Sequence, residues 1–157
     1  MNNKPGGPEV VILIGPQASG KSSFYLDKFF NTHIRINLDM LKTRHREKLI
    51  FEACLAAKQS VVIDNTNPTR QDRARYIEPA KSHAFSVSGY YMMTSLEDCL
   101  ERNKTRADDL AVPEPAIKAT WKRMEKPQLD EGFDDLRAVR AYEGDCIVEK
   151  FAQPTQK

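Results

Sequence analysis

Apolar residues along this chain form short continuous runs that alternate with stretches of helical spacing. Residues 10–14 are Val-Val-Ile-Leu-Ile, an uninterrupted apolar run of the kind found in a strand covered on both faces. Further runs predict strands over residues 33–37, 60–64, 85–92 and 146–151. Helical spacing predicts helices over or around residues 22–31, 49–55, 69–83, 95–104 and 116–124. Strands that alternate with helices predict an α/β fold, with a largely parallel central sheet and helices on both faces.

The segment directly after the first strand carries the strongest motif. It reads Gly15-Pro16-Gln17-Ala18-Ser19-Gly20-Lys21-Ser22, followed by Ser23. Gly-x-x-x-x-Gly-Lys-Ser between a strand and a helix is typical of a phosphate-binding loop, because its glycines let backbone N–H groups turn toward a phosphate. Lys21 would reach the β- and γ-phosphates of a nucleoside triphosphate, and the Ser22 hydroxyl would ligate Mg²⁺. The alternative is a glycine turn with a surface lysine, and the flanking strand and helix argue against it.

Asp39 lies just past the second predicted strand, and ligands gather at the carboxyl ends of parallel strands. A general base at this position would accept the proton of an acceptor hydroxyl held in line with the γ-phosphate. The alternative is a cap for the following helix, although a reciprocal capping box would need Glu or Gln where Lys42 stands. We therefore expect Asp39 to take part in catalysis.

Asp64 follows the third predicted strand directly. A carboxylate after a buried strand is where phosphate-binding-loop enzymes often hold Mg²⁺ through water or orient a neighbouring group. The alternative is a turn residue whose side chain bonds the backbone of residues 65–67. We interpret Asp64 as an active-site residue, whose part need not be the same as that of Asp39.

A pair of arginines follows the fourth predicted strand. Arg102 and Arg106 stand four residues apart, so we expect them on one face of a helix. Like charges at this spacing repel, and an anion between them would relieve the repulsion. The alternative is a solvated face on which Asp98 pairs with Arg102. A polar, proline-bounded loop follows, which favours a lid over residues 102–115 that brings both guanidinium groups to ATP phosphates.

Together these segments resemble the kinase domain of the polynucleotide 5′-kinase family, over residues 10–133. The motifs are the phosphate-binding loop, Asn37-Leu38-Asp39, Val62-Ile63-Asp64-Asn65-Thr66-Asn67-Pro68, Glu101-Arg102-Asn103-Lys104-Thr105-Arg106, Val112-Pro113 and Pro127-Gln128-Leu129-Asp130-Glu131-Gly132-Phe133. The loop alone is shared by a very large superfamily. The Asp-Asn-Thr-Asn-Pro run together with the Arg-Asn-x-x-Arg segment is much more specific.

The resemblance implies a P-loop kinase fold and phosphorylation of a 5′-hydroxyl on DNA or RNA, with ATP and Mg²⁺ as cofactors. It makes Asp39 the general base and Lys21 a catalytic group on the phosphates. It also has Arg106, assisted by Arg102, stabilise the charge on the transferring phosphoryl group. It places ATP on residues 15–23 and the two arginines. It places the acceptor on Asp39, Lys42, Asp64 and Asn67, and the metal on Ser22 and, through water, Asp64.

Two positions depart from the family pattern. Leu38 stands where many members carry Arg, and Lys42 stands where some carry an Arg that holds the acceptor's 3′-phosphate. Lys keeps the charge but lacks the bidentate fork, so the acceptor preference stays open. Basic residues that could line a nucleic-acid cleft, or equally form a solvated helix face, are Lys42, Arg44, Arg46 and Lys48. Candidates for stacking on bases are Tyr76, Tyr90 and Trp121.

Composition sets the remaining bounds. The 157 residues are 40% hydrophobic, and 24 Lys and Arg against 22 Asp and Glu give a net charge of +2, too small to indicate nucleic acid by itself. Three widely spaced cysteines without zinc-binding spacing favour reduced thiols in the cytoplasm, or in the nucleus of a eukaryote. We expect residues 1–8 to be a flexible leader without a signal peptide, residues 9–157 to be one kinase domain, and no membrane span.

Two other functions stay open. The chain could phosphorylate a small hydroxylated molecule, such as a nucleoside, a sugar or an antibiotic, in an enclosed and largely apolar pocket. It could also be a nucleotide-binding module without transfer activity, although Asp39 and the two lid arginines argue against a switch that needs no acceptor base. A polynucleotide kinase, by contrast, needs an open basic channel and shows salt-sensitive binding.

Overall fold

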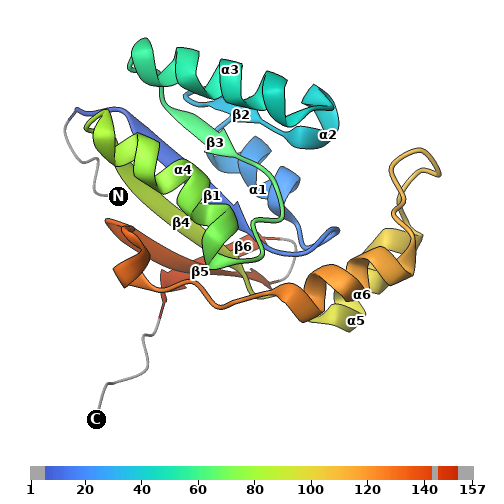
Figure 1. Ribbon diagram of the computed structural model, residues 1–157. Coiled ribbons are helices and arrows are strands. Elements are labelled where there is room, and N and C mark those ends of the chain that lie inside the picture. The colour runs from blue at the N-terminus through green and yellow to red at the C-terminus, as the bar shows by residue number, and fades with distance from the viewer. Residues whose placement is uncertain (1–5, 143–144, 152–157) are drawn as a thin grey trace.

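One six-stranded sheet forms the centre of the protein (Figure 1). The computed structural model describes residues 6–142 and 145–151. The sheet order is β2-β3-β1-β4-β5-β6, with the first five strands parallel and β6 antiparallel to β5. The strands are β1 (Glu9–Ile14), β2 (Ile34–Ile36), β3 (Val61–Ile63), β4 (Ser86–Met92), β5 (Asp135–Tyr142) and β6 (Asp145–Lys150). The predicted α/β fold with a largely parallel sheet is confirmed.

Helices cover both faces of this sheet. The helices are α1 (Lys21–Lys28), α2 (Leu38–Leu41), α3 (Arg44–Ala56), α4 (Arg70–Ser82), α5 (Leu96–Lys104) and α6 (Glu114–Arg123), with a 3₁₀ turn η1 (Leu129–Glu131). Apolar residues of α3 and α4 pack on one face, and those of α1 pack on the other. Helices α5 and α6 contact each other and stand beyond one end of the sheet (Figure 1).

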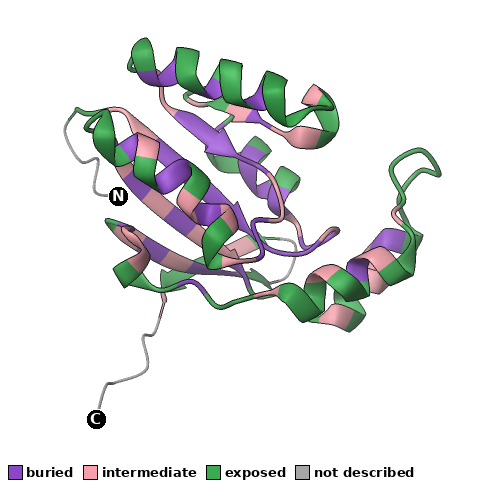
Figure 2. Ribbon diagram, viewed as in Figure 1, coloured by how far each residue is buried: buried purple, intermediate pink, exposed green. Residues whose placement is uncertain are grey.

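Strand β1 illustrates why its sequence is apolar throughout. Val10, Ile12 and Ile14 belong to the core cluster under α3 and α4, whereas Val11 and Leu13 belong to the cluster under α1. All five are buried, and Figure 2 shows the same burial along the middle of the sheet. Because successive side chains point to opposite faces, every side chain of a strand covered on both sides is buried, and apolar residues are favoured at every position.

Two elements differ from the sequence-based expectations. The β5 strand lies in a stretch for which the sequence pattern predicts no strand, because Asp135, Arg137 and Arg140 interrupt its apolar residues. Its buried residues are Leu136, Ala138 and Val139, and it sits near the sheet edge, where polar positions reach solvent. The short helix α2 is the second unpredicted element, and it carries Asp39.

Two helices begin at residues whose side chains cap them. Thr69 begins α4 with a capping box, in which its side chain accepts from Asp72 N and its backbone N–H donates to the Asp72 carboxylate. Ser95 accepts from Asp98 N at the start of α5. In the described part of the chain, no helix is long and apolar enough to span a membrane. Most of the predicted leader, residues 1–5, lies outside the described residues.

Candidate active site

The loop between β1 and α1 has the backbone geometry of a phosphate cradle. Gly20 has a φ of 98°, in the left-handed region that side chains rarely adopt. A Cβ at Gly15 would lie 2.6 Å from Ser19 Oγ and 3.0 Å from Met92 Cβ, so only glycine fits there. Helix α1 begins at Lys21 and directs its positive end toward the same loop.

Lys21 lies at the centre of this loop. Its side chain is 8% exposed, and Nζ donates to Gly15 O at 2.9 Å and to Pro16 O at 2.7 Å. Burial lowers the pKa of Lys21 to about 8, against the opposing charges of Asp64 and Asp39, and the Arg106 charge lowers it further. Lys21 therefore lies within electrostatic reach of both predicted carboxylates and of one lid arginine.

Asp64 closes a triangle of hydrogen bonds with Ser22 and Arg35. The Ser22 hydroxyl donates to Asp64 Oδ2 at 2.9 Å, and Arg35 Nε donates to the same oxygen at 2.8 Å. Arg35 Nη2 donates to Ser22 Oγ at 3.0 Å. Asp64 is 2% exposed, and its carboxylate makes these contacts instead of bonding the 65–67 backbone. Arg35, on β2, thus joins the candidate site although it belongs to none of the sequence motifs.

The triangle fits a magnesium site of the P-loop type. Because the Ser22 proton is directed at Asp64, an oxygen lone pair of Ser22 remains for a metal. Mg²⁺ commonly takes one or two protein oxygens and completes its shell with water and substrate phosphates, so it needs no cage of protein ligands. Among the described residues, no group of three or more His, Cys, Asp or Glu side chains could hold a metal ion.

Asp39 is exposed on α2, next to the Asp64 strand end. The α2 cap is Asn37, whose Oδ1 accepts from Met40 N at 3.0 Å and whose Nδ2 donates to Asp64 O at 2.6 Å. Thr43 caps α3, so neither helix uses Asp39 as its cap. The Asp39 carboxylate thus stands on a short helix tied to the strand that ends in Asp64.

The lid arginines are placed differently from each other. Helix α5 ends at Lys104, so the expectation that Arg102 and Arg106 share one helix face is wrong. Arg102 Nη1 lies 3.0 Å from where a Cβ of Gly20 would be, against the phosphate loop. Arg106 is exposed in the loop after α5 and donates to Leu110 O at 3.4 Å.

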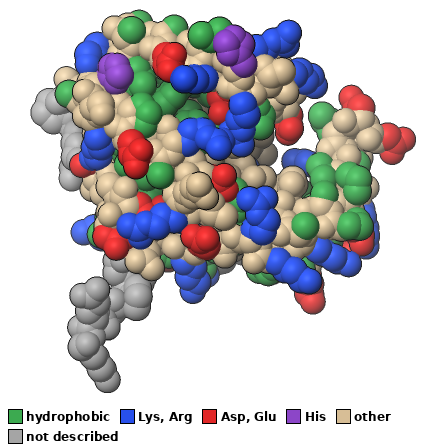
Figure 3. Space-filling view, in the orientation of Figure 1, with side chains coloured by type: hydrophobic (Ala, Val, Ile, Leu, Met, Phe, Trp, Pro, Cys, Tyr) green, Lys and Arg blue, Asp and Glu red, His purple; other side chains and the backbone are tan. Residues whose placement is uncertain are grey.

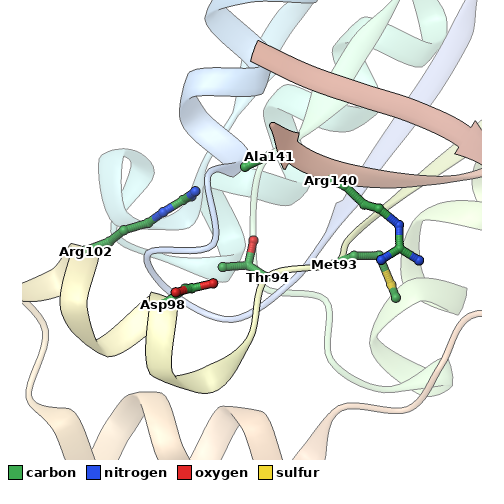
Figure 4. A pocket seen from close by; sticks show the side chains of 6 residues that line it. All are labelled: Met93, Thr94, Asp98, Arg102, Arg140 and Ala141. Carbon is green, nitrogen blue, oxygen red and sulfur yellow. The ribbon is translucent and has the colours of Figure 1, made fainter. Parts of the chain in front are cut away.

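Asp98 does not neutralise Arg102: within residues 6–142 and 145–151, no ion pair joins them. Both side chains instead project from α5 toward a small pocket that Met93, Thr94, Arg140 and Ala141 also line (Figure 4). A larger pocket of about 450 Å³ opens beside it, between the phosphate loop, Arg102 and the end of β5. This pocket offers room for a nucleotide next to the loop.

The two predicted acceptor residues Asn67 and Lys42 differ in their surroundings. Asn67 is 3% exposed, and its Nδ2 donates to Leu13 O at 2.8 Å, which fastens the 65–67 loop to the end of β1. Lys42 is exposed between α2 and α3 and has a φ of 74°. Among the stacking candidates, Tyr76 is buried and has no free face, whereas Trp121 on α6 is partly exposed.

The elements described here define a P-loop kinase: a nucleotide-binding enzyme that transfers a phosphoryl group. Residues 10–127 match the family described as AAA domain. The chain belongs to this AAA domain family.

Two curated relatives are each 32% identical to this chain. One is the bifunctional polynucleotide phosphatase/kinase of Schizosaccharomyces pombe, over 136 residues and 83% of this chain. The other is a protein of Acanthamoeba polyphaga mimivirus, over 146 residues and 88% of this chain. The chain spans about a third of the length of these relatives, 33% and 35%. The resemblance to the polynucleotide kinase family is confirmed.

A solved structure at lower identity shares the fold. The gluconokinase of Sinorhizobium meliloti 1021 is 20% identical, with a TM-score of 0.59, and the alignment covers 85% of this chain and 82% of that chain. At this identity the likeness concerns the fold alone.

Proposed function

We propose that this kinase transfers the γ-phosphate of ATP to the 5′-hydroxyl of DNA or RNA. The observation that carries the proposal is the position of Asp39, on a helix tied to the Asp64 strand and within electrostatic reach of Lys21. An exposed carboxylate beside a phosphate-binding loop is suited to accept the proton of an alcohol. The name of a curated relative, a bifunctional polynucleotide phosphatase/kinase, supports this choice of acceptor class.

In this mechanism the chain's own residues bind and orient the reactants. Lys21 and the loop N–H groups hold the β- and γ-phosphates, and Ser22 and Asp64 would hold Mg²⁺. The metal supplies charge neutralisation between the phosphates when it is bound. Asp39 takes the proton as the 5′-oxygen forms its bond to the γ-phosphorus, and the bond from that phosphorus to the bridging oxygen breaks, so that ADP leaves. Arg102 and Arg106 stabilise the charge on the transferring group.

The acceptor side favours an extended substrate over an enclosed small one. Lys42, Arg44 and Arg46 are exposed in the stretch that follows Asp39, with Lys42 just after α2 and the two arginines in the first turn of α3. Figure 3 shows Lys and Arg side chains among Asp and Glu side chains over the face that carries α3 and α4. If cations beside Asp39 contact nucleic-acid phosphates, as we propose, acceptor binding should weaken with salt. A small-molecule kinase is the second candidate, because the gluconokinase has the same fold. Its acceptor binding would be nearly independent of salt.

The test is transfer of labelled γ-phosphate from ATP to 5′-hydroxyl oligonucleotides, as DNA and as RNA. Lys21→Ala and Asp39→Asn should abolish labelling, whereas Asp27→Asn, an exposed carboxylate on α1, should leave it unchanged. Labelling that survives Asp39→Asn would remove the base assignment. ATP binding without labelling of either oligonucleotide would favour the small-molecule kinase if a screened alcohol is labelled, and a non-catalytic module if none is.

A further inference from the structure

A buried carboxylate on α3 anchors the polar contacts beneath Asp39. Glu47 is 2% exposed, and both of its oxygens accept hydrogen bonds. Oε1 accepts from Arg44 Nη1 and from Tyr76 OH, each at 2.9 Å, and Oε2 accepts from Asn65 Nδ2 at 2.8 Å. A buried charge needs such partners, so Glu47 imposes an orientation on each of them.

Asn65 carries this contact to the helix that bears Asp39. Its Oδ1 accepts from Leu38 N at 2.8 Å. Leu38 is the first residue of α2, where the backbone N–H has no partner within the helix. None of the four residues of α2 is fully buried, although Leu41 packs against the core under α3 and α4, so the polar bonds to Asn37 and Asn65 help to fix where the helix stands.

We propose that Glu47 is a positioning residue for the Asp39 base, acting through the side-chain amide of Asn65. The inference rests on the proposed function, in which Asp39 accepts the proton. A carboxylate offers only acceptors, so Asn65 has to turn its NH₂ group toward Glu47 and its oxygen toward Leu38. The opposite orientation would oppose two acceptors at Glu47 and two donors at Leu38.

Tyr76 and Arg44 keep the carboxylate in this role. Burial, together with the Glu47 charge, raises the pKa of Tyr76, so its hydroxyl keeps a proton to donate to Oε1. The Arg44 guanidinium holds the same oxygen. Oε2 is therefore left to Asn65, and the hydrogen bonds from Glu47 to Leu38 form one directed chain.

Glu47→Gln breaks this chain with little change in shape. The new amide has one acceptor, which Arg44 and Tyr76 retain, so its NH₂ group faces Asn65 and either opposes a donor or turns the Asn65 amide over. Opposed donors would push Asn65 away from its position, and a turned amide would present its NH₂ group to Leu38. In both cases the hydrogen bond from Leu38 N–H to Asn65 Oδ1 is weakened or lost. We expect hydrogen exchange of the Leu38 amide, measured by NMR, to rise about tenfold. Oligonucleotide labelling should show kcat about 10- to 100-fold lower, with the KM for ATP within about twofold.

Glu52→Gln is the matched control, since Glu52 is exposed on the same helix and pairs only loosely with Lys48, at 3.7 Å. The double variant Glu47→Gln with Asn65→Asp is the rescue. A carboxylate at position 65 accepts from both the new amide and Leu38 N–H, so slow exchange and most of kcat should return.

Three results would overturn the proposal. One is a Glu47→Gln enzyme with the kcat and Leu38 exchange of the Glu52→Gln control. Another is parallel loss of ATP affinity and melting temperature without rescue by the double variant, which indicates a purely structural role. The third is altered Leu38 exchange with unchanged kcat. A wild-type enzyme that labels no oligonucleotide overturns the proposed function instead, and Leu38 exchange then decides alone whether Glu47 holds α2.

Discussion

Arg73 on α4 and Arg106 on the lid differ in how completely the structure satisfies their charges. Arg73 is fully buried, and all three guanidinium nitrogens are hydrogen-bonded: Nε and Nη2 donate to Glu131, at 2.7 and 3.1 Å, and Nη1 donates to three carbonyl oxygens. Arg106 is exposed and donates one long bond to Leu110 O. A satisfied guanidinium holds the fold together, whereas an unsatisfied one is available to a ligand.

This difference gives a physical meaning to two motifs of the sequence. Two carbonyl acceptors of Arg73 belong to Asn67 and Pro68, in the motif that follows β3. The third belongs to Glu125, just before the motif of residues 127–133, and the carboxylate partner Glu131 lies within that motif. Arg73 thus joins the loop after β3 to the segment that leads into β5. No charged side chain of residues 102–115 is buried in this way: Arg102 lies against the phosphate loop, and Arg106 is exposed in the loop after α5.

The largest effect on activity is expected from Arg106→Ala. An arginine that stabilises transferring phosphoryl charge contributes about 10³- to 10⁵-fold to kcat. We expect a loss of about 10³-fold in kcat and a melting temperature within about 1 °C of wild type, because an exposed charge adds little stability. Arg123→Ala, another exposed arginine, is the control and should retain activity. If both variants had a similar kcat, Arg106 would not be the residue that stabilises the transferring phosphoryl group.

Breaking the buried ion pair between Arg73 and Glu131 should lower stability, whereas Arg106→Ala should lower kcat. Arg73→Met leaves Glu131 buried without its counter-charge, and we expect a loss of about 3–5 kcal/mol in the free energy of unfolding. Urea denaturation measures this. Arg70→Met removes the exposed pair with Asp130 and should cost less than about 1 kcal/mol. The double variant Arg73→Met with Glu131→Met should recover most of the loss; no recovery would mean that the backbone contacts of Arg73, not the pair, carry its effect.

The sequence predicts contiguous features of this molecule well and isolated charges poorly. The phosphate loop and the strand that ends in Asp64 carry local signals, because the spacing of glycines and apolar residues is visible in a short window. The structure brings Asp64, which directly follows β3, to Ser22 at the start of the helix after the phosphate loop, at the carboxyl end of the parallel sheet. Arg35, Glu47 and Arg73 carry no such signal, since each finds its partner in a different element.

The same reasoning applies to the elements that differ from prediction. Strand β5 lies one strand in from the sheet edge, and its charged residues Asp135, Arg137 and Arg140 interrupt the apolar pattern by which a buried strand is recognised. Helix α2 is too short for helical periodicity and depends on the Asn37 and Asn65 amides. Arg106 leaves the helix face because α5 ends at Lys104, a boundary that four-residue spacing cannot reveal.

Because Lys21 titrates, the contribution of the phosphate loop to ATP binding should depend on pH, whereas that of the lid arginines should not. Its pKa is about 8 in the folded protein, below its ordinary 10.5, so between these values the unfolded chain binds more protons and the free energy of unfolding should rise with pH. ATP phosphates favour the charged lysine, so ATP affinity should fall above pH 8, by up to about tenfold per pH unit. Guanidinium groups stay charged throughout, so the lid contributes no such dependence.

Calorimetry with ATP across pH 7–10 and parallel thermal melts without nucleotide measure both trends. Lys21→Met should flatten the contribution of this site to the melts, whereas Arg106→Ala should leave the pH dependence of ATP affinity intact. An ATP affinity that is equally steep in pH for wild type and Lys21→Met would assign the titration to another group.

The smallest effect is expected at Asn103, which holds the lid loop closed. It is buried at the end of α5; its Nδ2 donates to Val112 O at 2.7 Å, and its Oδ1 accepts from Val112 N at 2.9 Å. Asn103→Ala releases the loop that contains Arg106, so we expect kcat to fall about three- to tenfold, with a smaller stability loss than in Arg73→Met. Asn103→Asp keeps the acceptor for Val112 N–H, so its kcat should lie between those of wild type and Asn103→Ala. If Asn103→Ala instead destabilised the protein as much as Arg73→Met and left kcat unchanged, the lid would be a structural clamp like the α4 side.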